Sequence, residues 1–158
     1  MVAQEIESEI RNTNLVQFYD SELFTWNYNM FGDLTLNYRN INSGISFGIN
    51  DTMKNALLEF LDSGQAYNSY RKKNIAGNIL INGGLAIVLS SYIPLYDNLL
   101  MLNFDQNKYD SNIRWTIGLA ASGLISTIIG SFISTSGTES LFNSVNLFNR
   151  NKARELSK

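Results

Sequence analysis

The chain has 158 residues, a formal net charge of −2, and 44% hydrophobic and 16% charged residues. It contains no cysteine and no histidine, which excludes disulfides and thiolate metal sites and removes the commonest general base of enzymes. The small net charge and the lack of a basic stripe with interleaved aromatic residues argue against a nucleic-acid partner. With no phosphate-binding glycine loop or nucleophile elbow either, we expect no catalytic, cofactor-binding or metal site.

The N-terminal part is predicted to be a small α+β region. Residues 1–14 are polar, and residues 15–73 form a soluble or interfacial part whose many aromatic side chains are predicted to pack a small core. Apolar and polar residues alternate in 34–39 and again in 45–49, on either side of a turn at 40–44 that is rich in Asn, Ser and Gly. Alternation with period two predicts a β-hairpin. Two strands alone are marginal in water, so this hairpin needs a packing partner.

That partner is predicted to be a helix that begins near residue 51. Asn50 or Asp51 can cap this helix, and its apolar residues recur at helical spacing: Met53, Ala56, Leu57, Phe60 and Leu61. Ser63 and Gly64 then weaken the helical pattern before it resumes. We expect a bend at Gly64, because helix kinks often occur at Gly/Ser pairs.

Two apolar segments follow, Ile75–Leu95 and Trp115–Ile133, and neither contains Asp, Glu, Lys or Arg. Each is about 20 residues long, so as a helix each is about 30 Å long, which matches the hydrocarbon core of a bilayer. We therefore predict a transmembrane helical hairpin over residues 74–135. Aromatic and basic residues near its two ends are typical interfacial anchors: Tyr67, Tyr70, Arg71, Lys72, Lys73, Tyr92, Tyr96 and Trp115.

The connection between the two segments, Tyr96–Arg114, is expected to be a solvated polar loop. Pro94 suits the end of the first membrane helix, where the backbone can leave helical geometry. The connection contains Asp97, Asp105 and Asp110, but their spacing does not match a calcium-binding EF-hand loop, and the glycine that such a loop requires does not occur in the connection.

Small and polar residues recur every fourth position in both segments. The first segment has Asn74, Asn78, Asn82, Ala86 and Ser90, and the second has Gly118, Ser122, Ser126, Gly130 and Ser134. Small residues at this spacing let helix backbones approach closely in lipid, and Asn amides in hydrocarbon need a partner. We expect the two stripes to face each other or a neighbouring subunit. The alternatives are a water-filled pore lined by the Asn stripe and a chance result of an Asn-rich composition.

The C-terminal residues 137–158 are predicted to form a separate short helix and a basic tail. After Gly137, Leu141, Val145 and Phe148 lie on one face of a helix over 138–149. Such an amphipathic helix either lies on the membrane or docks on the N-terminal part.

The chain from about Phe18 to Asn149 resembles a loosely defined family of two-helix envelope membrane proteins of Bacteroidetes-type bacteria. The residues that carry the resemblance are Ala66, Tyr67, Tyr70, Gly77, Trp115-Thr116-Ile117-Gly118, Ser136-Gly137, Leu141, Val145 and Leu147-Phe148-Asn149. Where members of the family close with Tyr-Asn after a Lys-rich helix, this chain has Phe148-Asn149 and lacks the Lys residues. The resemblance implies an envelope location and a cleaved signal peptide, but no activity or catalytic residue.

Two signals conflict about the side of the membrane on which the ends of the chain lie. Ala3-Gln4-Glu5 is typical of the residues that follow a signal-peptidase cut, which places both ends outside. Basic residues instead flank the predicted hairpin, at 71–73 and again from Arg150 onward, and the positive-inside rule places both ends in the cytoplasm. We expect both termini to be cytoplasmic, because those charges are present in the sequence.

The sequence therefore predicts a mainly α membrane protein: a transmembrane helical hairpin, a small N-terminal part made of a β-hairpin and an amphipathic helix, and a C-terminal amphipathic helix. The expected function is that of a small structural or accessory subunit of a bacterial envelope membrane complex, without catalytic activity. The alternative is an oligomeric channel or holin-like pore former. The expected partners are the lipid bilayer and other membrane protein subunits, in a hetero- or homo-oligomer, and no cofactor is expected.

Overall fold

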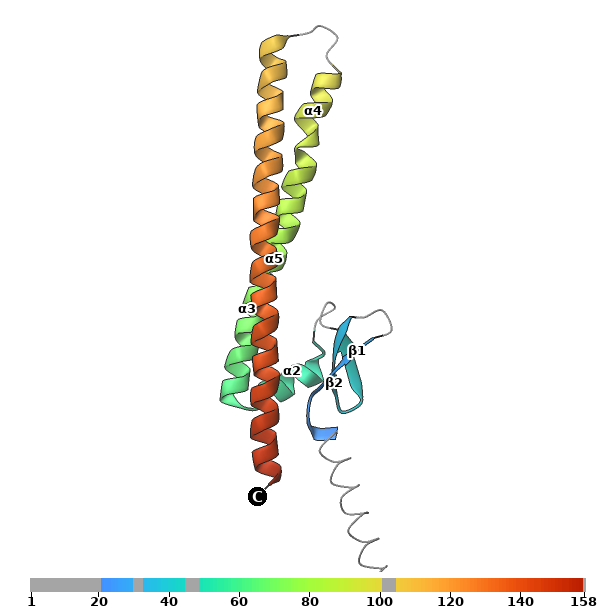
Figure 1. The fold of residues 1–158 in the computed structure, drawn as a ribbon, viewed down its shortest axis with the longest axis vertical. Helices are drawn as coiled ribbons and strands as arrows, with labels where there is room; N and C mark the ends of the chain where they lie inside the picture. The colour runs from blue at the N-terminus through green and yellow to red at the C-terminus, as the bar shows by residue number, and fades with distance from the viewer. Residues whose placement is uncertain (1–20, 30–32, 45–48, 101–104, 158) are drawn as a thin grey trace, which may run out of the picture. The chain divides into compact units, whose positions relative to one another are not determined.

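The structure, a computed structural model, describes residues 21–29, 33–44, 49–100 and 105–157. Its elements in chain order are β1 (Thr25–Tyr28), β2 (Leu34–Tyr38), β3 (Ile41–Gly44), α2 (Asp51–Leu57), α3 (Leu61–Ser90), α4 (Tyr92–Leu99) and α5 (Gln106–Leu156) (Figure 1). The chain divides into two compact units, residues 1–68 with 140–158 and residues 69–139. We refer to them as the terminal unit and the hairpin unit.

The terminal unit contains a three-stranded antiparallel sheet in the order β1-β2-β3. A β-hairpin is present, as predicted, but its predicted turn at 40–44 is wrong, because residues 41–44 form a strand. The turn is the two-residue pair Arg39-Asn40, both with positive φ (49° and 62°), so β3 begins at Ile41. Two left-handed residues in succession match the right-handed twist of the paired strands. Of the predicted second strand, residues 45–48 lie outside the described residues.

A third strand, β1, was not predicted from the sequence. Trp26 of β1 pairs with Leu36 of β2 in the antiparallel register. The segment that contains β1 is rich in aromatic residues, and this composition indicated a core without indicating its secondary structure. The extra strand matters because three strands with one apolar face are more stable than an isolated hairpin.

The helix predicted to begin near residue 51 is α2. The Asn50 side chain accepts a hydrogen bond from the Thr52 backbone N–H at 2.8 Å, which confirms the predicted cap. The predicted bend at Gly64 is wrong, since Gly64 lies inside α3 and the break falls between α2 and α3 at residues 58–60. Ser63 stabilises this turn because its hydroxyl donates to the Leu57 carbonyl at 2.6 Å.

The core of the terminal unit joins the sheet to the last turns of α5. Its side chains with no exposed surface include Leu36, Met53, Leu57, Leu141, Val145 and Phe148. The helix predicted at the C-terminus therefore docks on the N-terminal part. It is not a separate helix, because α5 continues through Gly137, and the predicted tail is helical as far as Leu156.

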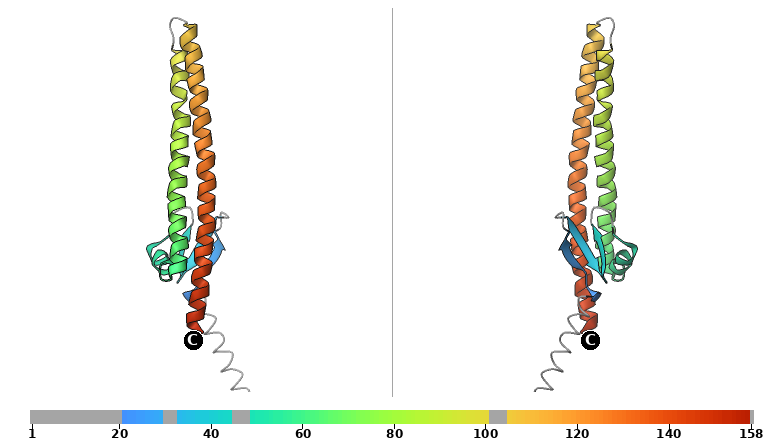
Figure 2. Two further views of the ribbon diagram at one scale, coloured as in Figure 1. Left: turned by 90° about the vertical axis from the view of Figure 1, so that its left-hand side faces the viewer. Right: turned by 90° about the vertical axis from the view of Figure 1, so that its right-hand side faces the viewer.

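The hairpin unit consists of the later part of α3, α4 and most of α5, which lie side by side and antiparallel in both views of Figure 2. Pro94 interrupts the first arm, since proline cannot donate to the carbonyl four residues earlier and the α3–α4 break falls at Ser91. The predicted polar loop is mostly helical. Asp105 caps α5 by accepting the Asn107 backbone N–H at 3.0 Å, and residues 101–104 lie outside the described residues.

Candidate functional site

Glycines bring the two arms of the hairpin unit into backbone contact. A Cβ atom added to Gly77 would lie 2.8 Å from the Gly130 carbonyl oxygen, and one added to Gly84 would lie 2.5 Å from that of Gly123. The reverse substitutions meet the same obstacle, at 2.7 Å for Gly130 and 2.6 Å for Gly123. Real Cβ atoms do not come this close to backbone atoms, so any side chain at these positions would push the helices apart.

These glycines are spaced by seven residues, not four. Seven residues of a straight α-helix bring the chain back to the same face with a drift of only about 20°, whereas four residues drift by about 40°. Gly77 and Gly84 on α3, and Gly123, Gly130 and Gly137 on α5, therefore stay on one face along the whole contact. The fourfold stripes predicted from the sequence rotate off that face.

The small-residue stripe predicted on α5 is consequently divided. Gly130 is buried, Ser126 and Ser134 are half-buried, and the Ser126 hydroxyl donates to the Leu80 carbonyl at 3.0 Å. Gly118 and Ser122 are exposed, and a Cβ atom added to Gly118 would meet nothing within 4 Å in the described chain. Only the C-terminal end of the predicted stripe thus contacts α3.

The predicted Asn stripe points away from α5. Asn74 is half-buried at the edge of the contact, and Asn78, Asn82, Ala86 and Ser90 are exposed. The Asn78 amide donates to the Asn74 side chain at 3.4 Å, and Asn82 has no hydrogen-bond partner within the described residues. The expectation that the two stripes face each other is therefore wrong within one chain, because the fourfold spacing drifts around α3. The alternative expectation, that the stripes contact a neighbouring subunit, stays a prediction.

The two apolar segments lie at the same level of the hairpin. Gly84 sits next to the midpoint of Ile75–Leu95 and contacts Gly123, which sits next to the midpoint of Trp115–Ile133. Their large side chains point outward and form one exposed apolar band: Ile75, Ile79, Leu85, Leu89, Ile93, Ile117, Leu124, Ile125, Ile128, Ile129 and Phe132. Large apolar groups thus lie outside and small residues lie between the helices.

The helices that carry this band, Leu61–Leu99 and Gln106–Leu156, are long and apolar enough to cross a membrane. In each helix, only 11% of the most apolar stretch of 18 residues is buried. Two helices in the core of a soluble protein would bury most of such a stretch, so this exposure favours an apolar surrounding.

Residues at the two ends of the band differ from one another in exposure. Tyr92, Tyr96 and Trp115 are exposed by 61%, 62% and 64%, as interfacial anchors require. Arg71 and Lys72 are exposed as well, and the Lys73 ammonium donates to the Ser136 hydroxyl at 3.0 Å across the two arms. Two predicted anchors are buried instead, namely Tyr67 in the terminal unit and Tyr70 in the hairpin unit.

The end of the hairpin near the α4–α5 connection is polar and cross-linked. Lys108 forms an ion pair with Asp97 at 3.1 Å, and Asn112 donates to Asn98 at 2.7 Å. The hydrogen bond from Lys108 lowers the pKa of Asp97. Within the described residues, no three His, Cys, Asp or Glu side chains lie close enough together to hold a metal ion.

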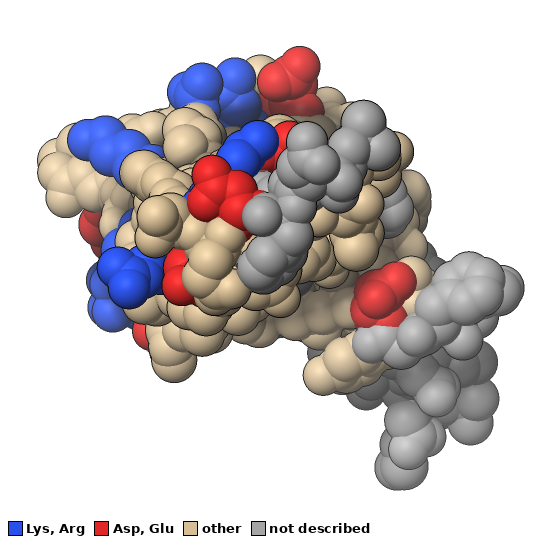
Figure 3. Space-filling view, turned by 90° about the horizontal axis from the view of Figure 1, so that it is seen from above, with Lys and Arg blue, Asp and Glu red and all other residues tan. Residues whose placement is uncertain are grey.

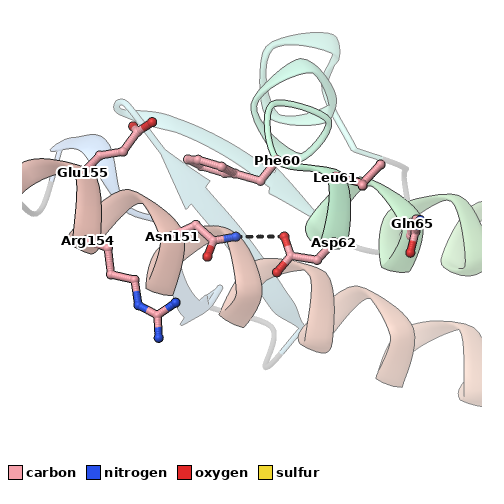
Figure 4. Close-up of a pocket in the computed structure, with 7 residues that line it drawn as sticks. All are labelled: Phe60, Leu61, Asp62, Gln65, Asn151, Arg154 and Glu155. Carbon is pink, nitrogen blue, oxygen red and sulfur yellow. Dashed lines mark hydrogen bonds between the residues drawn. The ribbon is translucent and has the colours of Figure 1, made fainter.

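The terminal unit has a pocket of about 430 Å³ lined by Phe60, Leu61, Asp62, Gln65, Asn151, Arg154 and Glu155 (Figure 4). The Asp62 carboxylate accepts a hydrogen bond from Asn151 at 2.8 Å and lies 3.6 Å from Arg150. Figure 4 shows the Arg154 guanidinium and the Glu155 carboxylate on opposite sides of α5. The polar groups of the pocket therefore do not converge on one point where a ligand atom could sit.

Three polar side chains of α5 pair with the N-terminal part, and none of these contacts is predicted from the sequence. The Asn149 amide accepts from the Phe24 backbone N–H and donates to the Phe24 carbonyl, both at 2.8 Å. Ser144 donates to the Ser63 carbonyl at 2.8 Å, and Lys152 bonds Glu59 at 3.0 Å, which raises the pKa of Lys152. The signal available in the sequence was their position beside Val145 and Phe148.

Ion pairs of the terminal unit are exposed and therefore contribute little to stability. They include Arg39 with Glu22 at 2.6 Å and Lys152 with Glu155 at 3.3 Å. Figure 3 shows basic and acidic side chains interspersed on the face of the molecule seen from above.

A scan of protein-family models, a search of curated proteins and a search of solved structures found no match.

Proposed function

We propose that this chain is a two-span membrane protein that serves as a small structural or accessory subunit of a bacterial envelope membrane complex, without catalytic activity. One observation supports the proposal most strongly: the two apolar segments lie level with each other, with large side chains outside and glycines between the helices. In water, helices associate by burying their large apolar side chains. In lipid those side chains gain nothing by meeting, and small residues at the contact allow close packing.

The level arrangement also favours a single bilayer crossing by each arm. The apolar length of each arm matches a hydrocarbon core of about 30 Å, and both arms reach the same depth because Gly84 lies against Gly123. Polar and aromatic groups follow at either end of the band, including Lys73 at one end and Tyr96 at the other. This order is typical of a membrane-spanning hairpin.

An antiparallel hairpin with two crossings places both ends of the chain on one side of the membrane. That side carries the basic run Arg71, Lys72 and Lys73, whereas the opposite end carries Asp97, Asp105 and Asp110. The positive-inside rule then favours a cytoplasmic location for both ends. The envelope location, and membrane protein subunits as partners, rest on the resemblance to the two-helix envelope proteins and on the exposed Asn stripe.

Extraction of membranes at high pH tests the membrane proposal. The full chain, expressed in bacteria, should stay in the membrane pellet after carbonate treatment, because two crossings hold it in the bilayer. A peripheral protein of the same membranes is the control and should be released. Release of the chain into the supernatant would overturn the proposal. Recovery of a stoichiometric protein partner under mild detergent would identify the complex.

A channel or holin-like pore is the second candidate function. The exposed Asn78 and Asn82 favour it, since amides on one helix face can line a water-filled axis when several copies assemble. Such a pore would conduct ions in reconstituted bilayers, and Asn82→Leu would reduce the conductance. A chain that conducts no current as an assembled oligomer would contradict this candidate.

A further inference from the structure

We propose that Arg71, Lys72 and Lys73 of α3 bind the headgroups of anionic phospholipids, in the leaflet that surrounds the start of the first apolar segment. We call these three residues the basic cluster. This inference rests on the proposed membrane insertion, and it adds the chemical class of the lipid and the place where it binds.

The basic cluster lies at the depth of the headgroup phosphates in a hairpin that spans the bilayer. The uncharged segment begins at Ile75, two to four positions after the basic cluster, which along a helix is about 3–6 Å. A bilayer about 40–45 Å thick has a hydrocarbon core of about 30 Å, so each headgroup layer is about 5–8 Å thick. The helix is continuous at this point, because α3 extends from Leu61 to Ser90.

The three cations point in different directions around α3, since successive residues of a helix are rotated by about 100°. Arg71 and Lys72 are exposed, and the exposed apolar band begins directly after them at Ile75. Lys73 is half-buried, and its ammonium donates to the Ser136 hydroxyl at 3.0 Å and to the Ser136 carbonyl at 3.3 Å. Two cations therefore face the surrounding lipid, and the third is held beside α5.

The two exposed cations have no carboxylate partner within the part of the chain that the structure describes. The ion pairs there use other basic residues. Glu139 is the acidic residue of the hairpin unit nearest to the basic cluster in its antiparallel arms, and it forms no ion pair with the described residues either. The other acidic residues of this unit lie at the opposite end: Asp97, Asp105 and Asp110.

This excess of positive charge favours an anionic headgroup over a zwitterionic one. In a zwitterionic lipid the phosphate is already neutralised by the lipid's own ammonium group, whereas an anionic lipid brings a net negative charge. Basic residues beside a membrane helix attract such lipids. The Arg71 guanidinium can also donate two parallel hydrogen bonds to one phosphate.

Spin-labelled lipids measure this preference in vesicles that contain the full chain. Lipids next to a spanning protein give a motionally restricted spectrum, and the restricted fractions of phosphatidylglycerol and phosphatidylcholine give their relative association constant. We expect phosphatidylglycerol to be favoured by about 2-fold to 5-fold at low salt. High salt should reduce the preference, because it screens exposed charges.

Arg71→Gln combined with Lys72→Gln should remove most of this preference. Lys108→Gln combined with Arg114→Gln is the matched control, because it removes the same charge at the opposite end of the hairpin unit, and it should retain the preference. All four residues are exposed, so none of these substitutions disturbs a packed core. Arg71→Lys keeps the charge and should also retain the preference.

The same spectra separate this inference from the proposed function. No restricted component from either lipid would overturn both together, since lipids would then not surround the chain. A restricted component that is equal for the two lipids would overturn this inference alone. So would an equal loss of preference in the two double variants, because the binding would then not depend on the basic cluster.

Discussion

Gly83 and Gly84 are neighbours in the sequence, yet only one of them holds the hairpin together. A Cβ atom at Gly84 would lie 2.5 Å from the Gly123 carbonyl oxygen, whereas one at Gly83 would meet nothing within 4 Å in the described chain. Both residues lie in the middle of the first apolar segment. Substitutions at these two positions can therefore be compared to distinguish the cost of steric overlap from the general effect of replacing a glycine in a helix.

We expect Gly84→Ala to destabilise the hairpin by about 1–3 kcal/mol, the usual cost of overpacking. Gly83→Ala should be neutral, or stabilising by up to about 1 kcal/mol, because alanine favours helix more than glycine does. Thermal unfolding of the full chain in detergent measures both. Equal effects of the two substitutions would contradict the close contact between α3 and α5.

Tyr38 makes the stability of the terminal unit sensitive to alkaline pH. Its side chain is 3% exposed and stacks on Phe24 with ring centroids 4.4 Å apart. Burial raises the pKa of Tyr38 above its ordinary value of 10.0, against the opposing charge of Arg39. Above that ordinary value the unfolded tyrosine ionises while the folded one stays neutral, so the unfolded state binds fewer protons and is favoured.

We therefore expect the contribution of Tyr38 to the free energy of unfolding of the terminal unit to be fully present below about pH 10. This contribution should be lost as the pH rises through the raised pKa of Tyr38. Lys152, whose pKa is raised mainly by Glu59, acts in the same direction. Denaturant titrations at increasing pH measure the loss. Tyr38→Phe should reduce the slope of the free energy of unfolding against pH. Adding Lys152→Gln should reduce the slope that is left. A slope that neither variant changes would assign the alkaline loss to other groups.

At the scale of elements, α5 contributes to both units of the chain. Its first part contacts α3 in the hairpin unit, and its last turns complete the core of the terminal unit. Phe148 lies at the centre of that core, where its ring meets those of Phe24, Tyr38 and Phe60 at centroid distances of 5.0, 5.9 and 5.5 Å. Phe148 thus joins the sheet to the turn between α2 and α3, although it lies more than eighty positions further along the chain.

Phe148→Ala should destabilise the terminal unit by about 3–5 kcal/mol, since it leaves a cavity in a fully buried site. Asn146→Ala, at an exposed position of the same helix, should change stability by less than about 0.5 kcal/mol. Denaturant unfolding followed by near-ultraviolet circular dichroism is the measurement. If Phe148→Ala were as mild as its control, the docking of α5 on the sheet would be refuted.

The missed turn between α2 and α3 shows why local patterns locate a break poorly. The sequence predicts the bend at Ser63 and Gly64, but these residues lie in the first turn of α3, which follows the bend. Ser63 donates to the Leu57 carbonyl at 2.6 Å, and a Cβ atom at Gly64 would lie 3.5 Å from Leu58. The residues that stabilise a turn need not occupy it, because side-chain hydrogen bonds reach back by several positions.

At the scale of the whole molecule, the proposed topology places the α4–α5 connection and the two ends of the chain on opposite sides of a bilayer. Ser111→Cys, near the connection, should react with a membrane-impermeant thiol reagent in intact cells. Asn146→Cys, in the terminal unit, should react only after permeabilisation. The reverse pattern would place both ends outside the cytoplasm, and equal labelling of both in intact cells would refute two crossings.

The sequence by itself determined that the chain has two uncharged apolar helices of membrane-spanning length, a β-hairpin and a capped helix at Asn50. Each of these depends on residues close together in the chain, whose spacing sets which side chains share a face. Only the tertiary structure decided that the contact of the hairpin follows Gly77, Gly84, Gly123 and Gly130 rather than the fourfold stripes, and that Asn82 points outward. It also placed Phe148 and Asn149 against the sheet. The reason is that the rotation of a helix about its axis depends on whether two backbones can touch, and that depends on residues far apart in sequence.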